Sequence, residues 1–355
     1  MPIRFRGRAA PDGSALAAEL RARLEPDAEI IAAGERRDLY MRDRFQPLRH
    51  RETRPALVLR PASAGDVATA VQWACERNLP VTPRGLSTTA HGESLPTRGG
   101  LLIDLAQFNR IGPVDDGAGT VHVQAGVTWG DLDAHLESSG LALATYPASR
   151  FSTVGGWVST GGLGINSFGY GHLRRWVAAL EVVTGAGEVR TLTPRDKLFA
   201  ACFGAEGSLG VVTGITLRLR PAPDFARAHL FYFDSTAEQL EFVRHLIASR
   251  APVAHVGLFD PRYMAYQNRL YEEAGRRGAG LCGGSALAGT VLSAGAQALR
   301  SEPAHRTSRD AAAGDGGFHR RGDAARRAVR AIPCGLGRGR RRRWRLRGAG
   351  DAALP

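Results

Sequence analysis

Cysteine is scarce in this chain of 355 residues. The four cysteines, Cys75, Cys202, Cys282 and Cys334, lie far apart in the sequence. No two of them form a CxxC pair, and this spacing argues against a disulfide scaffold, a zinc site and a cysteine-ligated iron–sulfur cluster. We therefore expect no metal centre.

Lysine is scarcer still, because Lys197 is the only one among 47 basic residues. A phosphate-binding P-loop needs Gly-Lys followed by Ser or Thr, and the sequence has no such run. Any phosphate site must therefore use backbone N–H groups, hydroxyls or arginine.

Long apolar runs are also missing. No stretch of 18 apolar residues occurs, so we expect no transmembrane helix. The N-terminal run MPIRFRGRAAPDG is basic but has no apolar stretch of the kind a secretory signal needs. From these two features we expect a cytoplasmic protein.

The net charge of +13 is unevenly distributed. Residues 276–355 hold 17 Arg against 5 acidic residues, which leaves residues 1–275 close to neutral. The overall charge therefore says little about what the main body of the chain binds, and nucleic acid is not the partner we expect for it.

Residues 276–355 are rich in Arg, Gly and Ala. Leu, Ile, Val and Phe together supply only 11 of these 80 residues, which is less than a self-supporting core needs. Three interpretations stand: a disordered solvated tail, a basic arm for nucleic acid or acidic lipid centred on residues 338–347, and an out-of-frame stretch of a GC-rich gene. We expect no regular structure in this tail.

The preceding residues alternate between strand and helix patterns. A strand at 57–60 is followed by a helix at 64–77, which begins with a capping pair of Ser63 and Asp66, and by a strand at 79–83. Further elements are strands at 101–105, 121–125, 177–184, 189–192 and 209–220 and helices after Thr128 and around 195–203. This order predicts the α+β class.

A second module is predicted to begin near residue 226. It consists of a strand at 228–233, a helix at 236–249 and a strand at 252–259, and it ends where the composition changes.

Three glycine-rich segments are the candidates for a binding site, and the alternatives for them are an ordinary surface loop, a flexible linker and a turn with a solvated Glu. The loop PRGLSTTAHGESLP (83–96) combines glycines with hydroxyl side chains, which suits close approach to phosphate oxygens. Residues 146–171 contain seven Gly interleaved with apolar residues, so their backbone can wrap around a flat ligand. The third segment, 203–212, has three glycines directly before a predicted strand.

Together these segments resemble the FAD-binding domain of the vanillyl-alcohol-oxidase/p-cresol-methylhydroxylase (PCMH) superfamily, in particular its glycolate oxidase and D-lactate dehydrogenase branch. The resembling runs are RPALVLRPASAGDVATAVQWA, LPVTPRGLSTTAHGESLP, GGLLIDLAQFNRI, VHVQAGVTWGDLDAHLESSGLAL, STVGGWVSTGGLG and FGAEGSLGVVTGITLRLRP. They cover residues 50–223, which implies a PCMH-type FAD-binding domain of two subdomains. An N-terminal extension (1–49) would precede it, and the start of an incomplete α+β substrate or cap domain (224–275) would follow.

The resemblance also implies roles for single residues. Positions in the first segment would face the FAD diphosphate, positions in the second would line the flavin, and positions in the third would lie near the adenine end. The diphosphate set is Pro83, Arg84, Gly85, Ser87, Thr88, Thr89 and Gly92; the flavin set is Pro147, Thr153, Val154, Gly155, Gly156, Ser159, Gly161 and Gly162; the adenine set is Glu206, Gly210 and Val211.

The type of flavin attachment follows from one position. Where members of the family with a covalent flavin often have His, this sequence has Thr88, so the resemblance implies FAD that is bound non-covalently. His91 is close by but out of register. Two other positions depart from the branch: Ser87 stands where Gly is common, and Arg175 stands where Asp is common.

The resemblance implies oxidation of a small 2-hydroxy acid, of the D-lactate or glycolate type, or a related alcohol, by hydride transfer to flavin N5. The HxGDGNxH motif of this branch is absent, so no catalytic residue is assigned and the electron acceptor stays open. His172, Arg174 and Tyr263 are candidates for base or carboxylate partner, with surface or packing roles as the alternative. The competing functions are a non-catalytic flavin-binding protein and a basic-tailed nucleic-acid-binding protein.

Overall fold

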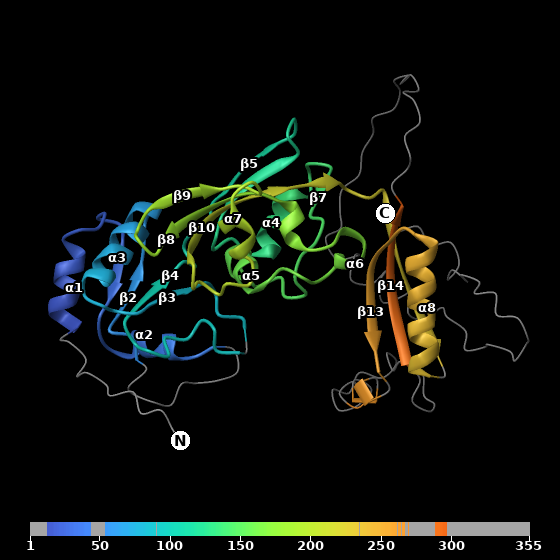
Figure 1. Ribbon diagram of the computed structural model, residues 1–355, viewed down its shortest axis with the longest axis horizontal. Coiled ribbons are helices and arrows are strands. Elements are labelled where there is room, and N and C mark those ends of the chain that lie inside the picture. The colour runs from blue at the N-terminus through green and yellow to red at the C-terminus, as the bar shows by residue number, and fades with distance from the viewer. Residues whose placement is uncertain are drawn as a thin grey trace, which may run out of the picture. The chain divides into compact units, whose positions relative to one another are not determined.

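The computed structural model describes residues 13–43, 54–89, 91–233, 235–260, 262–263, 265–266, 269 and 288–296. Their contacts divide the chain into two compact units, residues 1–222 and 223–355 (Figure 1). The α+β fold class is confirmed, and most predicted elements lie within one or two residues of the observed ones.

The first sheet of unit one has the strand order β1-β2-β4-β3. Strands β2 (Leu57–Arg60), β4 (Leu101–Asp104) and β3 (Val81–Arg84) run parallel, and β1 (Glu29–Ile31) joins β2 antiparallel at the edge. The segment 13–43 also contains α1 (Gly13–Arg21), α2 (Glu35–Asp38) and η1 (Leu39–Met41). Part of the predicted N-terminal extension thus packs on the domain, because β1 is the edge strand of its sheet. A strand of three residues is too short to show a period in sequence.

The second sheet of unit one is antiparallel throughout, with the order β5-β6-β10-β8-β9. Its strands are β5 (Ile111–Asp115), β6 (Thr120–Gln124), β10 (Gly210–Arg218), β8 (Val177–Thr184) and β9 (Val189–Leu192). A separate pair is formed by β7 (Leu141–Ala142) and β11 (Arg220–Pro221). The remaining helices of this unit are α3 (Ala64–Glu76), α4 (Trp129–Leu136), α5 (Val154–Thr160), α6 (Ser167–Tyr170), η3 (Leu173–Trp176) and α7 (Lys197–Ala201).

Helix α3 joins the two sheets into one body. Its start is fixed by Ser63, whose hydroxyl accepts from the Asp66 N–H at 3.2 Å, while the buried Asp66 carboxylate accepts from the N–H groups of Glu25 and Ala62. The helix also contacts β8 and β9 (Figure 1). Its fully buried Val67 and Trp73 belong to one core that contains strands of both sheets.

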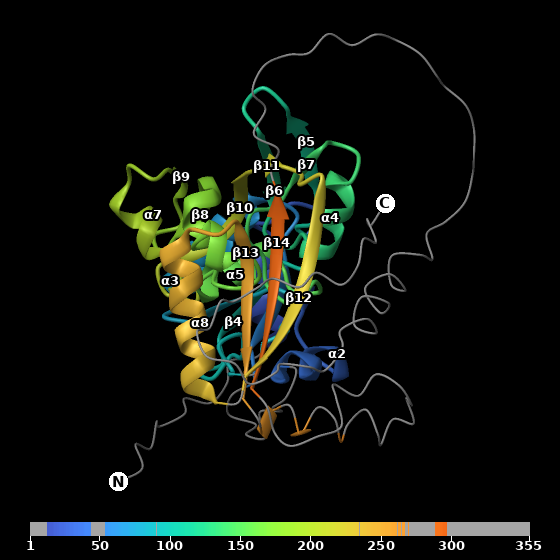
Figure 2. The same ribbon diagram turned by 90° about the vertical axis from the view of Figure 1, so that its right-hand side faces the viewer.

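Unit two contains a three-stranded sheet in the order β12-β14-β13. Strands β12 (Phe225–Phe233) and β13 (Val253–Phe259) both pair antiparallel with β14 (Ala288–Ala296), and α8 (Thr236–Ser249) accompanies them (Figure 2). Phe242 of α8 is buried with Phe233 and Val253. This unit begins next to the domain boundary at residue 223 that the sequence analysis places.

Strand β14 corrects the prediction for the tail. Residues 288–296 were expected to lack regular structure, yet they form the central strand of this sheet. Composition alone misses such a strand, because two neighbours satisfy its backbone groups whatever its intrinsic propensity. The rest of residues 276–355 lies outside the described residues, and so do the three interpretations of it.

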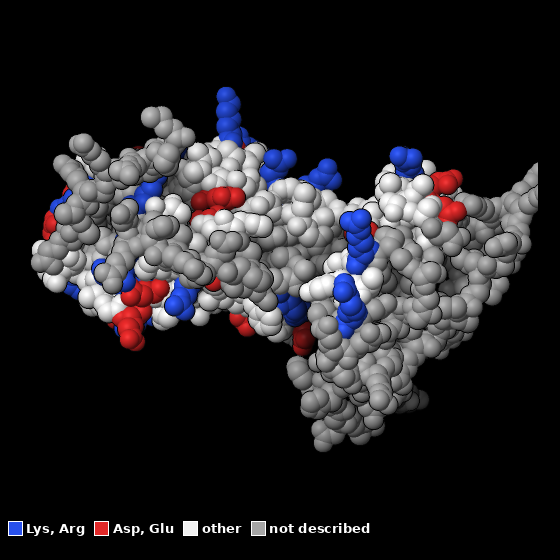
Figure 3. Space-filling model, turned by 90° about the horizontal axis from the view of Figure 1, so that it is seen from below, with Lys and Arg blue, Asp and Glu red and all other residues white. Residues whose placement is uncertain are grey.

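Charge on the described surface is mixed in sign. In Figure 3, Lys and Arg side chains are interspersed with Asp and Glu side chains on the face shown, and no single sign gathers over a large area of the described residues there. In the part of the chain that the structure describes, no helix has both the length and the apolar character needed to cross a bilayer.

Gly126 provides a test of the packing. A Cβ at this position would lie 2.1 Å from the carbonyl oxygen of Leu105 and 2.8 Å from that of Phe108. We expect Gly126→Ala to destabilise the chain by about 1–3 kcal/mol, as overpacking does, in urea unfolding followed by circular dichroism. Gly117→Ala is the matched control, since its Cβ would meet only Asp115 at 3.4 Å. Equal stability of the two variants would contradict this packing.

Candidate functional site

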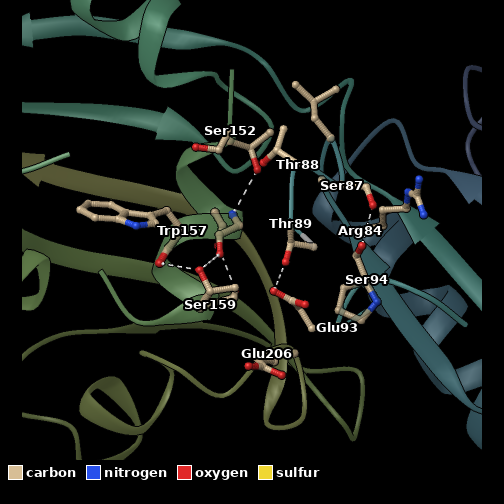
Figure 4. Close-up of a pocket in the computed structure, with 18 of the residues that line it drawn as sticks. Arg84, Ser87, Thr88, Thr89, Glu93, Ser94, Ser152, Trp157, Ser159 and Glu206 are labelled. Carbon is tan, nitrogen blue, oxygen red and sulfur yellow. Dashed lines mark hydrogen bonds between the residues drawn. The ribbon is translucent and has the colours of Figure 1, made fainter. Parts of the chain in front are cut away.

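Unit one contains a cavity of about 490 Å³. All three glycine-rich segments line it. Its size is within the usual range for ligand pockets. Of the predicted site residues, 13 line it: Pro83, Arg84, Gly85, Ser87, Thr88, Thr89, Pro147, Thr153, Gly155, Gly156, Ser159, Glu206 and Gly210. In Figure 4, the side chains of Thr89, Ser159 and Glu206 lie around this space and come from the loop after β3, from α5 and from the loop before β10.

Five predicted residues do not line the cavity. Val154 and Val211 are buried in the core, so their side chains face away from a ligand. Gly92 directs its N–H to the Asp43 carboxylate at 3.1 Å. Gly161 and Gly162 follow α5 with positive φ angles, and a Cβ on Gly162 would lie 2.7 Å from Leu173.

The first segment turns sharply after β3. Ser87 adopts a left-handed backbone with φ 51°, where glycine would be unstrained. Its hydroxyl lies 2.7 Å from the hydroxyl of Ser94, which closes the loop on itself. The loop is thereby held in shape by its own side chains, with a serine in a backbone conformation that favours glycine.

Glycines allow the three segments to touch. A Cβ on Gly85 would lie 2.5 Å from the hydroxyl oxygen of Thr153, and a Cβ on Gly207 would lie 2.4 Å from Pro83. The N–H of Glu206 donates to the carbonyl of Ser159 at 2.9 Å. Each segment is therefore in direct contact with the other two, and the space between them is the cavity.

The second segment is shaped by a short helix. Thr153 caps α5 by accepting from the N–H of Gly156 at 3.2 Å. Gly155 donates to the carbonyl of Ala125 at 2.9 Å, so the helix lies close against β6. This helix has no clear signal in the sequence, because its glycines are poor helix formers.

Arg84 departs from its expected role. Its guanidinium donates to the carbonyls of Tyr40 and Arg42, at 3.1 and 2.7 Å, and lies over the Tyr40 ring. Figure 4 shows it directed away from Thr88 and Ser152. Burial lowers the pKa of this guanidinium, and nearby Asp104 opposes that shift. Arg84 therefore anchors the loop to the N-terminal segment.

The Tyr40 side chain is held in place by Asp104. Its hydroxyl donates to the Asp104 carboxylate at 2.7 Å, and Arg60 donates to the same oxygen at 3.1 Å. Burial, together with the hydrogen bond to Asp104, raises the pKa of Tyr40 to about 12. The first segment is thus tied to β4 through Arg84 and Tyr40.

Sequence reasoning did not assign several lining residues. Ser149, Ser152, Trp157, Glu93 and Ser94 lie within the glycine-rich segments, so the segments themselves were the signal. Val212 closes the third segment, whereas Leu105 and Ala125 reach the cavity only because the strands bring them there. His91 also lines it, from an exposed position.

The proposed catalytic candidates are not brought together. His172 accepts from the backbone N–H of Arg174 at 3.0 Å, and burial lowers the pKa of this imidazole, with a further contribution from Arg174. Neither residue lines the cavity. Tyr263 belongs to unit two, where its ring stacks on Phe259 with centroids 5.2 Å apart.

The cavity suits a dinucleotide with a flat ring system. It offers apolar residues beside the hydroxyls of Ser87 and Thr88. The hydroxyls of Ser152 and Ser159 donate to the carbonyls of Ser149 and Gly155, at 2.7 and 2.9 Å. Two of the lining residues, Ser149 and Glu93, each have a buried side-chain oxygen without a partner among the described residues, namely the Ser149 hydroxyl and one Glu93 carboxylate oxygen. Such atoms are costly unless a ligand or water satisfies them.

Comparison with known proteins agrees with this geometry. Residues 55–193 match the family described as "FAD binding domain". The chain is 31% identical over 211 residues to D-lactate dehydrogenase of Anaerostipes hadrus, covering 56% of this chain and 44% of that protein. It is 30% identical over 217 residues to glycolate oxidase subunit GlcD of Bacillus subtilis, covering 59% and 46%. The chain thus spans about half the length of the curated relatives it matches.

The fold is shared with a solved structure, that of an alkyldihydroxyacetonephosphate synthase. The TM-score is 0.65 at 20% identity, and the match covers 82% of this chain and 58% of that one. The fold, the family match and the contacts between the three segments agree. Residues 55–193 therefore match an FAD binding domain, and the cofactor of this domain is FAD.

Proposed function

We propose that the chain is an FAD-dependent oxidoreductase that binds FAD non-covalently in the cavity and oxidises a small 2-hydroxy acid. The observation that carries the proposal is the convergence of the three glycine-rich segments on one cavity within a matched FAD binding domain. Relatives named for D-lactate and glycolate oxidation support this substrate class. Bound FAD would accept the hydride from the hydroxyl-bearing carbon of the substrate.

The residues of the cavity have separate tasks in this proposal. Ser87 and Thr88 supply hydroxyls, and Gly85 and Gly156 let the backbone approach the cofactor. Trp157 and Val212 supply apolar surface and exclude water from one side. A cytoplasmic location stays a prediction.

Non-covalent attachment rests on Thr88. A threonine hydroxyl takes the position in which covalent members of the family often have His, while His91 is the imidazole among the lining residues. We expect acid precipitation of the purified chain to release all flavin absorbance into the supernatant. Flavin in the pellet would contradict this, and its loss in His91→Ala would identify that residue as the attachment point.

Gly85 provides a test of the cavity itself. Because a Cβ here would lie 2.5 Å from the Thr153 hydroxyl oxygen, Gly85→Ala should displace the loop from α5 and weaken FAD binding about tenfold or more. The measurement is a titration of apo-protein with FAD, with Gly117→Ala as the control that should bind normally. Unchanged affinity in Gly85→Ala would mean that FAD does not use this contact.

The substrate class is tested by anaerobic addition of D-lactate or glycolate to the FAD-loaded chain. We expect either acid to bleach the visible flavin band, since hydride transfer reduces the flavin. L-Lactate is the matched control for stereochemistry. A flavin that stays oxidised with a panel of 2-hydroxy acids would favour the non-catalytic alternative.

A further inference from the structure

The charged side chains that line the cavity differ from those of a typical anion-binding site, which would be mainly basic. Its ionisable lining residues are Arg84, His91, Glu93 and Glu206. The Arg84 guanidinium is already engaged by two backbone carbonyls. The cavity thus presents two carboxylates to a cofactor whose diphosphate is negative, and one of them, Glu93, lies on the same loop as the hydroxyls expected to face that diphosphate.

Glu93 is held in a defined orientation. One oxygen of its carboxylate, Oε1, accepts from the hydroxyl of Thr89. The Thr89 oxygen in turn receives the N–H of His91, at 3.4 Å. Thr89 therefore donates its only hydroxyl hydrogen to Glu93 and has none to donate to a phosphate. This differs from the role that the resemblance implies for Thr89.

The second oxygen, Oε2, is buried and has no partner among the described residues. Figure 4 shows the Glu93 carboxyl group between Thr89 and Glu206, on the side of the loop that faces Ser159. A buried carboxylate oxygen without a donor is strongly unfavourable. The geometry calls for a hydrogen-bond donor in the cavity at this point.

The position of Glu93 on the loop expected to face the diphosphate indicates which group of FAD donates to Oε2. Phosphate oxygens accept hydrogen bonds and repel a carboxylate, so the diphosphate is not the partner of Oε2. In FAD the groups on either side of the diphosphate are sugars, the ribose and the ribityl chain, and both carry hydroxyls. We propose that Glu93 Oε2 accepts from a sugar hydroxyl of bound FAD and that Thr89 is the positioning residue that fixes the carboxylate. The proposal rests on FAD binding in this cavity.

The test compares FAD affinity in the full-length apo chain and its Glu93→Gln variant. The amide keeps the oxygen that meets Thr89 but places an NH₂ where Oε2 stood. We expect FAD binding to weaken about ten- to a hundredfold, the loss typical of a hydrogen bond to a charged group. A carboxylate that merely repelled the diphosphate would give the opposite sign, so unchanged or tighter binding in Glu93→Gln overturns the proposal.

Two half-ligands identify the sugar. ADP carries the ribose and FMN carries the ribityl chain, and each is titrated against both proteins. Loss confined to one half-ligand supports the proposal and names the sugar. Equal loss on both, or loss on neither, overturns it, because the loop itself would then be disturbed.

Controls separate this proposal from the proposed function. Absence of FAD binding in the unaltered chain would sink the proposed function, whereas normal binding in both proteins sinks only the role of Glu93. Glu137→Gln, on an exposed residue remote from the cavity lining, should leave FAD affinity unchanged. If circular dichroism shows that Glu93→Gln does not fold, Thr89→Val tests the same pair. We expect Thr89→Val to weaken binding of the same half-ligand, by a smaller factor. Unchanged affinity in Thr89→Val would count against the proposal.

Discussion

The cavity depends on backbone contacts that leave no room for side chains. Three segments, separated by up to about 120 residues in sequence, meet at Gly85 against Thr153, at Gly207 against Pro83 and at Glu206 against Ser159. A β-carbon at either glycine would overlap its neighbour, so the residue type and the geometry of the site are inseparable here. The rest of unit one holds these segments in place: α3 joins the sheets, and β4 supports the first loop through Asp104, Tyr40 and Arg84.

Much of this arrangement is predictable from sequence. The strands at β2, β8 and β9 and the helix α8 have clear periods and caps, and they occur where predicted. The three glycine-rich segments identify most of the cavity, because residues with unusual backbone demands are conspicuous in any sequence. Leu105 and Ala125 could not be found in this way, since only the pairing of distant strands brings them to the cavity.

Other misses have different causes. Arg84 looked like a phosphate ligand, but the carbonyls that take its guanidinium come from residues 40 and 42, whose position no local pattern reveals. Strands β1 and β14 were missed because short or small-residue strands are stabilised by their neighbours rather than by their own propensity. The pairing of Glu93 with Thr89 is likewise visible only in the folded loop.

The central claim is that the cavity binds FAD, and tryptophan emission tests it most directly. Trp157 lines the cavity and makes an edge-to-face contact with Trp129, with centroids 5.2 Å apart. A bound flavin would lie close enough to quench the emission of Trp157. Titration of the apo chain with FAD should give saturable quenching at one FAD per chain, and Trp157→Phe should remove a large part of the signal without abolishing binding. A folded chain whose emission does not respond to FAD would contradict the account.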